Sequence, residues 1–257
     1  MNNEQSKLDN ILYKEKNPEK NLFDFVKRFW YLQNSENKVQ NYTILPDGYC
    51  DLIITIIVGK LQNIAVYGIW TKELEVQIPA NSIILGVCLK PLASEYILKQ
   101  NLSKLLNSNI FIEKDFWNIN ELDYENFEEI VQTLSSKMID QLQKIKLIDN
   151  RKIEIFKYLF QNNSSLKVEN LSQKIFWTSR QINRYFNSRF GLSLKSYHNI
   201  LRCSATYTNI REGEFFPKDD FYDQSHFIKE IKKHTGEIPT ELHKNKNDRF
   251  LQFRTLN

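Results

Sequence analysis

Cysteine, histidine and long apolar runs are all scarce in this chain of 257 residues. Its three cysteines, Cys50, Cys88 and Cys203, are widely separated and form no CxxC motif. This spacing indicates neither a disulfide framework nor a thiolate metal site. We interpret the three as small buried hydrophobes in a reducing compartment.

Histidine is confined to one end of the chain. His198, His226, His234 and His243 lie in the last sixty residues, without HxxxH spacing. A zinc site normally needs such spacing or a cysteine cluster beside it. We therefore expect no metal, no cofactor and no catalytic residues, and these absences count against an enzyme.

Long apolar runs are also missing. The longest candidate, Leu52 to Val58, has the length of a buried strand, whereas a membrane helix needs about 20 residues. The first ten residues are polar and contain no signal core. The sequence therefore predicts a cytoplasmic protein with no membrane partner.

Charge is distributed unevenly, although the net value is only +4. Residues 1–150 carry 16 Lys and Arg against 20 Asp and Glu, whereas the remainder carries 19 against 11. A basic surface suits a polyanion, because neutralising phosphates releases condensed counterions. A lysine-rich solvated face would look the same, so the charge alone leaves both interpretations open.

Short β-rich runs between Tyr42 and Leu89 predict several strands. The runs are YTILP, DLIITIIV, IAVYGIW, LEVQIP and SIILGVCL, and turn residues such as Pro46-Asp47-Gly48 separate them. Such spacing is typical of a β-sandwich or small barrel. The first forty residues are interpreted as a lead-in that ends in the aromatic segment Phe23 to Tyr31, which is expected to be a strand or a short helix that contributes to a core.

Helical periodicity replaces the strand pattern after Pro91. Apolar residues recur at helix-like intervals from Leu92 to Leu105 and again from Tyr124 to Ile148. The second of these helices is expected to pack on its own domain, with a linker or a dimerisation surface as alternatives. We place the domain boundary near Asp149, which gives domains over 1–149 and 150–257.

From Arg151 onward the sequence shows no strand signal and several capped helices. A helix over Val168 to Ile175 is followed by Thr178-Ser179 as the N-cap of a helix from Arg180 to Phe190, and Gly191 ends that helix. Two short helices joined by a tight turn, the second of them basic, are typical of a helix-turn-helix.

The second helix has a polar face whose chemistry suits base reading. That face carries Arg180, Asn183, Arg184 and Asn187. Arginine can bond bidentately to guanine, and asparagine to adenine, in the major groove. The alternative is a merely solvated helix face.

Two segments carry a family resemblance: SRQINRYFNSRFGLSLKSYHNIL, and FYDQSHFIKEIKKHTGEIP after it. Together they resemble the DNA-binding domain of AraC/XylS regulators, and the second is the more specific, because Gln224, Ser225, His226, Phe227, Gly236 and Pro239 follow the family's order and spacing. The resemblance implies two helix-turn-helix units that place recognition helices in successive major grooves. A joining helix over Leu194 to Arg211 would link them.

The resemblance also implies which residues contact DNA. The first recognition helix, within 179–190, would place Arg180, Asn183 and Arg184 at bases or nearby phosphates, and Thr178 and Ser179 at a phosphate-facing N-terminus. Asn187 is a further candidate because it lies on the same polar face. In the second, within 223–235, Asp223 would cap the helix. The groove-facing residues there would be Gln224, Ser225, His226 and Lys229, with Phe227 and Ile231 structural.

The chain departs from the family's pattern at three places. Phe176 stands where the first turn usually has glycine, and a bulky residue is ill-suited to positive φ, so the turn is expected to differ from the family's. The segment Glu212–Asp220, which contains Pro217, is short and leaves little room for the first helix of the second unit. Ser172 replaces an alanine, with little consequence.

The N-terminal half resembles the cupin-like sensor domain that precedes the DNA-binding unit in many bacterial regulators. The phrases YTILPDGYCDLIITI and ILGVCLKPLASEYIL carry this likeness, over about residues 22 to 120. No histidine lies in this half, which disfavours metal-dependent barrel chemistry. Asp47 is interpreted as a turn former ahead of Gly48.

Together these observations predict an α+β two-domain protein, with an N-terminal β-rich cupin-like barrel and flanking helices and a C-terminal all-α double helix-turn-helix domain. Its expected function is sequence-specific transcriptional regulation. The expected partner is double-stranded DNA, with a small-molecule effector at the N-terminal domain and a homodimer as further candidates. An interaction protein with a degenerate second helix-turn-helix is the alternative. A DNA-alkylation repair enzyme would need a matched reactive cysteine and a cysteine-rich metal site, which are both lacking.

Overall fold

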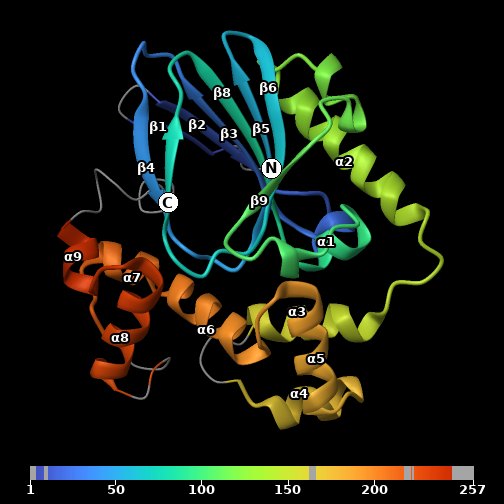
Figure 1. Cartoon of the computed structure of the whole chain (residues 1–257), viewed down its shortest axis with the longest axis vertical. Helices are drawn as coiled ribbons and strands as arrows, with labels where there is room; N and C mark the ends of the chain where they lie inside the picture. The colour runs from blue at the N-terminus through green and yellow to red at the C-terminus, as the bar shows by residue number, and fades with distance from the viewer. Residues whose placement is uncertain (1–3, 9–10, 162–165, 217–220, 222, 245–257) are drawn as a thin grey trace.

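The strands of this protein come first in the chain and the long helices afterwards, as Figure 1 shows. The computed structural model describes residues 4–8, 11–161, 166–216, 221 and 223–244. The predicted succession of a β-rich N-terminal part and a helical C-terminal part is confirmed. We call the elements up to α2 the β-rich part, and those from α3 onward the helical part.

Seven strands form one antiparallel sheet in the order β1-β2-β3-β8-β5-β6-β9. Their bounds are β1 Glu4–Leu8, β2 Ile11–Lys16, β3 Val26–Asn34, β5 Cys50–Ile57, β6 Lys60–Tyr67, β8 Ser82–Leu89 and β9 Asn109–Ile112. The central strand β8 is buried along its whole length, and its run SIILGVCL has no polar alternation. A strand that is covered on both faces typically has such a continuous run of apolar residues.

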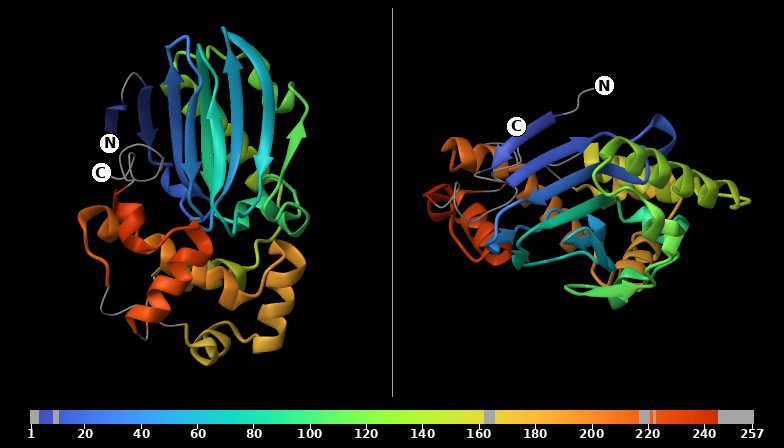
Figure 2. Two further views of the ribbon diagram at one scale, coloured as in Figure 1. Left: turned by 60° about the vertical axis from the view of Figure 1, so that its left-hand side comes forward. Right: turned by 90° about the horizontal axis from the view of Figure 1, so that it is seen from above.

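Two further strands, β4 (Gln40–Ile44) and β7 (Leu74–Ile78), pair with each other and cover one face of the larger sheet. Figure 2 shows the layers from two further sides. A buried apolar cluster fills the space between the two sheets and comprises Ile11, Leu32, Tyr42, Ile78 and Ile84. Among the described residues no ladder joins β4 or β7 to the larger sheet, so the strands form a two-layer sandwich.

Helices cover the opposite face of the larger sheet. The helix α2 (Phe127–Gln143) buries Phe127, Ile130, Val131, Leu134 and Met138 against it. These residues recur every three or four positions, as the sequence pattern indicated. In this structure α2 therefore packs on the β-rich part. Shorter elements complete this layer: η1 Lys20–Leu22, α1 Leu92–Tyr96, η2 Leu102–Lys104 and η3 Phe116–Glu121.

Two expectations for the β-rich part are corrected. Of the two forms expected for Phe23 to Tyr31, the strand is present in β3, but the lead-in before it also contains β1 and β2. In β2, buried Ile11 and Tyr13 alternate with less buried neighbours, which is an ordinary strand pattern. The helix expected up to Leu105 ends at Tyr96. Lys99 has a left-handed φ of 54°, which breaks the helix.

The helical part consists of short helices that are joined by tight turns. Their bounds are α3 Asn150–Gln161, α4 Val168–Ile175, α5 Ser179–Phe190, α6 Leu194–Ala205, α7 Tyr207–Glu212, α8 Gln224–Thr235 and α9 Pro239–Lys244. The single joining helix that was expected over Leu194 to Arg211 is two helices. At the break between them, the Thr206 hydroxyl donates to the Cys203 carbonyl oxygen at 2.8 Å, and such back-bonding disturbs the helical ladder.

The two parts share one continuous core. A single cluster of buried apolar residues runs from Leu52 and Val87 in the sheet, through Leu92 in α1, to Phe156 and Phe186 in the helices. Burial of apolar surface is the main favourable term in folding, so the two parts stabilise each other. They are therefore not loosely tethered units.

The turn Pro46-Asp47-Gly48 anchors this junction. The hydroxyl of Tyr197 in α6 donates to the Gly48 carbonyl oxygen at 2.9 Å, and that of Tyr207 in α7 donates to the Pro46 carbonyl oxygen at 2.9 Å. Asp47 is a turn former, as predicted, since its carboxylate accepts the Tyr49 backbone N–H at 3.1 Å.

A polar row crosses the sheet face that β4 and β7 cover. Arg28, Cys88, Asp51 and Tyr67 are cross-strand neighbours on β3, β8, β5 and β6. The Trp30 indole N–H approaches the Asp51 carboxylate at 3.4 Å. Burial raises the pKa of Asp51 to about 7, and the Asp47 carboxylate adds to this shift.

Stability is therefore expected to fall as pH rises through this carboxyl's range. In the unfolded chain the pKa of Asp51 is about 4, so between about pH 4 and 7 the native state keeps a proton that the unfolded chain releases. The variant Asp51→Asn should gain free energy of unfolding relative to wild type at pH 8, but much less at pH 5. Urea unfolding at both pH values measures this, and an identical pH dependence in the two proteins would contradict it.

Gly86 is required by the tryptophan that lies across it. A Cβ at position 86 would come within 1.9 Å of the Trp30 ring. We expect Gly86→Ala to lower the free energy of unfolding by about 2 kcal/mol, as overpacking does. In a Trp30→Ala background the same change should cost clearly less, because the clashing ring is gone. Equal costs in the two backgrounds would show that Trp30 is not the constraint.

Candidate nucleic-acid interface

The helices α4 and α5 form a helix-turn-helix whose second helix is capped at both ends. Thr178 accepts the Gln181 backbone N–H on its hydroxyl oxygen at 3.3 Å, while the Gln181 side-chain oxygen accepts the Thr178 N–H at 2.8 Å. This reciprocal capping box fixes the first turn of α5. Gly191, with a φ of 75°, ends the helix in the left-handed conformation.

The polar face of α5 is only partly free. Arg180, Arg184 and Asn187 are exposed, and the two arginines lie one helical turn apart. Asn183 is half-buried, its amide nitrogen donating to the Ser179 carbonyl oxygen at 3.0 Å and its amide oxygen accepting the Leu194 N–H at 3.3 Å. Asn183 thus ties α5 to the start of α6, which leaves the arginines as the free donors of this face.

Aromatic packing holds the other face of α5 in place. Phe186 and Phe190 are completely buried, and their ring centroids lie 5.8 and 5.6 Å from that of Phe156 in α3. Phe186 also packs 5.6 Å from Tyr197 in α6. Such aromatic pairs contribute beyond the area they bury, so the polar face of α5 is presented by a rigid helix.

The N-terminus of α5 is open to an anion. Thr178 and Ser179 are exposed there, and the first turn of this 12-residue helix contains no acidic residue. The free N–H groups and the helix dipole favour a negative group at such an end. A DNA phosphate is the anion that a helix-turn-helix would meet here.

The helix α8 exposes a second polar surface. Asp223 caps it by accepting the His226 N–H at 2.8 Å, as the sequence predicts. Gln224, Ser225 and Lys229 are exposed, whereas His226 is half-buried with its ring centroid 5.9 Å from that of Phe221. Phe227 and Ile231 are completely buried, in agreement with their predicted structural role.

The support of α8 differs from that of α5. Described residues 214–216, 221 and 223 form no helix in front of it, and Pro217, with residues 218–220 and 222, lies outside the described residues. Contacts with α6 and α9, and a small core with Tyr207 and Leu242, hold α8 instead. The His234 Nδ1–H also donates to the Thr71 carbonyl oxygen of the β-rich part at 2.7 Å.

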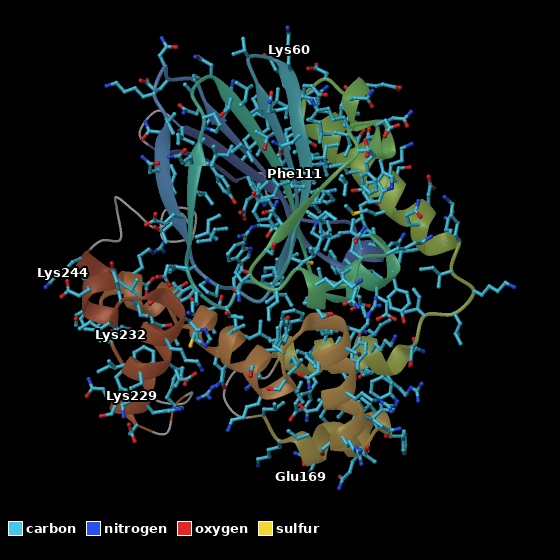
Figure 3. The ribbon with its side chains drawn as sticks, in the orientation of Figure 1. Lys60, Phe111, Glu169, Lys229, Lys232 and Lys244 are labelled. Carbon is cyan, nitrogen blue, oxygen red and sulfur yellow. The ribbon has the colours of Figure 1, made fainter. Side chains whose placement is uncertain are left out.

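The candidate residues form two groups on different helices. The helices α5 and α8 lie on either side of α6 (Figure 1). Figure 3 shows Lys229 and Lys232 on α8 and Lys244 on α9 along one side of the helical part. Two separate reading helices are what a double helix-turn-helix arrangement needs.

The described part of the chain contains neither a group of potential metal ligands nor a membrane-spanning helix. Within it, no three His, Cys, Asp or Glu side chains gather as metal ligands would. The described helices include none with both the length and the apolar character needed to cross a bilayer. All three cysteines are buried, in agreement with their interpretation as small buried hydrophobes.

Comparisons with known proteins give weak likenesses. A family model described as a domain of unknown function (DUF6597) matches residues 14–111, and no curated protein matches the chain. One similar solved structure is ToxT from Vibrio cholerae O395, with 12% identity, a TM-score of 0.44 and coverage of 80% of this chain and 96% of that one.

Another ToxT structure, at 1.65 Å resolution, is 14% identical with a TM-score of 0.42, and the match covers 91% of this chain and 97% of that one. These values show similarity without defining a function. The function of this chain has to be argued from its own residues.

One contact behind α5 has no signal in the sequence. Glu95 of α1 accepts hydrogen bonds from Lys152 in α3 and from the Tyr185 hydroxyl in α5, the latter at 3.2 Å. Arg189 of α5 approaches the same carboxylate at 3.6 Å. The partners lie 57 to 94 residues away in the chain, so no local pattern reveals them.

The turn of the first unit contains backbone strain. Phe176 has a φ of 55° in the left-handed region, and its side chain is 90% exposed. The expectation that the turn differs because Phe176 replaces glycine is therefore wrong: Phe176 keeps the left-handed conformation that glycine usually adopts, and its phenyl ring is not buried in compensation. Gly191 adopts similar dihedrals, but a Cβ there would lie 3.1 Å from the Ser103 Cα.

Glycine at position 176 is therefore expected to stabilise the protein. The variant Phe176→Gly should raise the free energy of unfolding by about 0.5–1 kcal/mol, because it removes left-handed strain without losing burial. The matched change Gly191→Ala should lower it by at least about 1 kcal/mol. Urea unfolding decides, and a destabilised Phe176→Gly would show that the exposed ring makes a stabilising contact.

Proposed function

We propose that this chain is a sequence-specific DNA-binding transcriptional regulator of the AraC type, acting in the cytoplasm, that reads the major groove with α5. The observation that carries the proposal is the α4–α5 unit. It presents a capped helix with a buried aromatic back and two exposed arginines one turn apart. The same proposal holds that the chain is not an enzyme.

The chemistry of α5 assigns a role to each exposed group. Arg180 and Arg184 are the candidates for bidentate bonds to guanine, each worth about 1–3 kcal/mol of discrimination. Thr178 and Ser179 face a phosphate, which sets the register of the helix on the duplex. Asn187 lies one turn beyond Asn183 and is the candidate for a further base or phosphate contact, while Asn183 orients the helix.

The helix α8 is the proposed second reader. Gln224, Ser225 and Lys229, with His226 beside them, are its candidate contacts. The β-rich part is proposed to hold a small-molecule effector, for which Arg28 and Asp51 between the sheets supply polar groups. A homodimer would place two such units on one operator.

Binding of genomic DNA tests the proposal. Fragments recovered with the wild-type protein should share a defined sequence, and the double variant Arg180→Ala/Arg184→Ala should lose it, with a fall in affinity of about 100-fold or more. Affinity of the wild type should also fall steeply between two salt concentrations. Sequencing of bound fragments and titration of the enriched one provide the measurement.

A matched variant controls for charge alone. Lys38→Ala/Lys60→Ala removes the same charge from exposed positions of the β-rich part. Lys60 lies at the end of the sheet away from the helical part (Figure 3). This variant should bind like wild type. No enrichment by wild type, or equal binding by the arginine variant, would exclude the proposal and favour an interaction protein that does not read DNA.

A further inference from the structure

The carboxylate of Glu95 lies where three elements of the protein meet. It belongs to α1 of the β-rich part, its side chain is 19% exposed, and its partners are Lys152 of α3 and Tyr185 and Arg189 of α5. Lys152 also lies 5.0 Å from the ring centroid of Tyr185. One acidic group therefore faces two cations and a hydroxyl, all from the helical part.

This carboxylate contacts the back of α5. Tyr185 directly follows Arg184 in the chain and is buried, whereas Arg184 is exposed. Arg189 lies one turn further along the same buried side. The β-rich part thus contacts α5 without covering its reading face, so the contact is suited to positioning the helix and not to blocking it.

The connection from the sheet to Glu95 is short. The central strand β8 ends at Leu89, and α1 begins at Leu92. Cys88 of β8 lies between Arg28 and Asp51 in the polar row of the sheet. A change in the sheet at that row therefore reaches the α5 contact within seven residues of chain.

We propose that Glu95 is a positioning residue that sets α5 for sequence-specific DNA binding and links its position to the central strand of the β-rich part. This inference rests on the proposed function and names the regulation of the same reading helix. Breaking a partly buried ion pair leaves its partners uncompensated. Loss of this carboxylate frees Tyr185, Arg189 and Lys152 together.

The test uses the full chain carrying Glu95→Gln, with Glu113→Gln as the matched control. Both variants lose one negative charge from the β-rich part, but Glu113 is exposed and lies after β9, outside the junction. Affinity is measured for the duplex that wild type enriches and for an unrelated duplex. The ratio of the two affinities should fall about tenfold in Glu95→Gln and stay at the wild-type value in Glu113→Gln.

Amide hydrogen exchange without DNA gives a second readout. Exchange in α5 should be faster in Glu95→Gln than in wild type, while exchange in α8 should not change. The variant Tyr185→Phe removes one donor instead of the acceptor and should act in the same direction. The two changes together should have less than their summed effect, since they break one contact.

A merely structural role would lower both affinities in parallel with thermal stability, and would leave their ratio unchanged in folded protein. An unchanged ratio together with wild-type exchange in α5 would overturn the proposal. If wild type enriches no sequence at all, the proposed function fails separately. The exchange comparison then decides alone: faster exchange confined to α5 supports the Glu95 contact, and unchanged exchange refutes it.

Discussion

The carbonyl oxygens of Pro46 and Gly48 are taken out of water where the helical part meets the sheet, and buried carbonyls need donors. The hydroxyls of Tyr197 and Tyr207 supply them, one from α6 and one from α7. Gly48 is suited to this place because its φ is 81° and a Cβ would lie 2.6 Å from Leu201. The docking of α6 and α7 on the β-rich part depends on this turn.

From that junction the two candidate reading helices are held by different means. The back of α5 rests on aromatic rings and on the Glu95 carboxylate, whereas α8 rests on a smaller core and on a bond from His234 to Thr71. Burial lowers the pKa of His234, whose Nδ1–H donates to the Thr71 carbonyl oxygen. Both helices are therefore held by contacts with the β-rich part as well as with α6.

Local sequence patterns predicted the elements whose signal is strong and short-range. The five apolar runs between Tyr42 and Leu89 became β4 to β8, and the caps Thr178, Gly191 and Asp223 lie where they were expected. The missed strands differ in their signal: β2 has a local alternation of buried and less buried residues, whereas β9 has only four residues and is held by its distant partner β6.

For the candidate site, too, local sequence patterns predicted some features and tertiary contacts determined the others. The residue types on α5 and α8 could be read from the sequence, but the half-buried state of Asn183 and His226 could not, because it depends on Leu194 and Phe221. Tertiary contacts decide which polar groups of a helix stay free. The family resemblance indicated which positions could contact DNA. The packing around these positions shows which of their side chains are exposed and which already contact other residues of the protein.

The continuous core has a consequence for how such a chain can change over generations. In a protein built of tethered modules, a sensing unit can be exchanged without disturbing the reading unit. Here Phe156, Phe186 and Tyr197 share one buried cluster with Leu52 and Val87, so each half carries part of the other's interior. Recombination between the halves would expose apolar surface on both, and the two are therefore constrained to be inherited together.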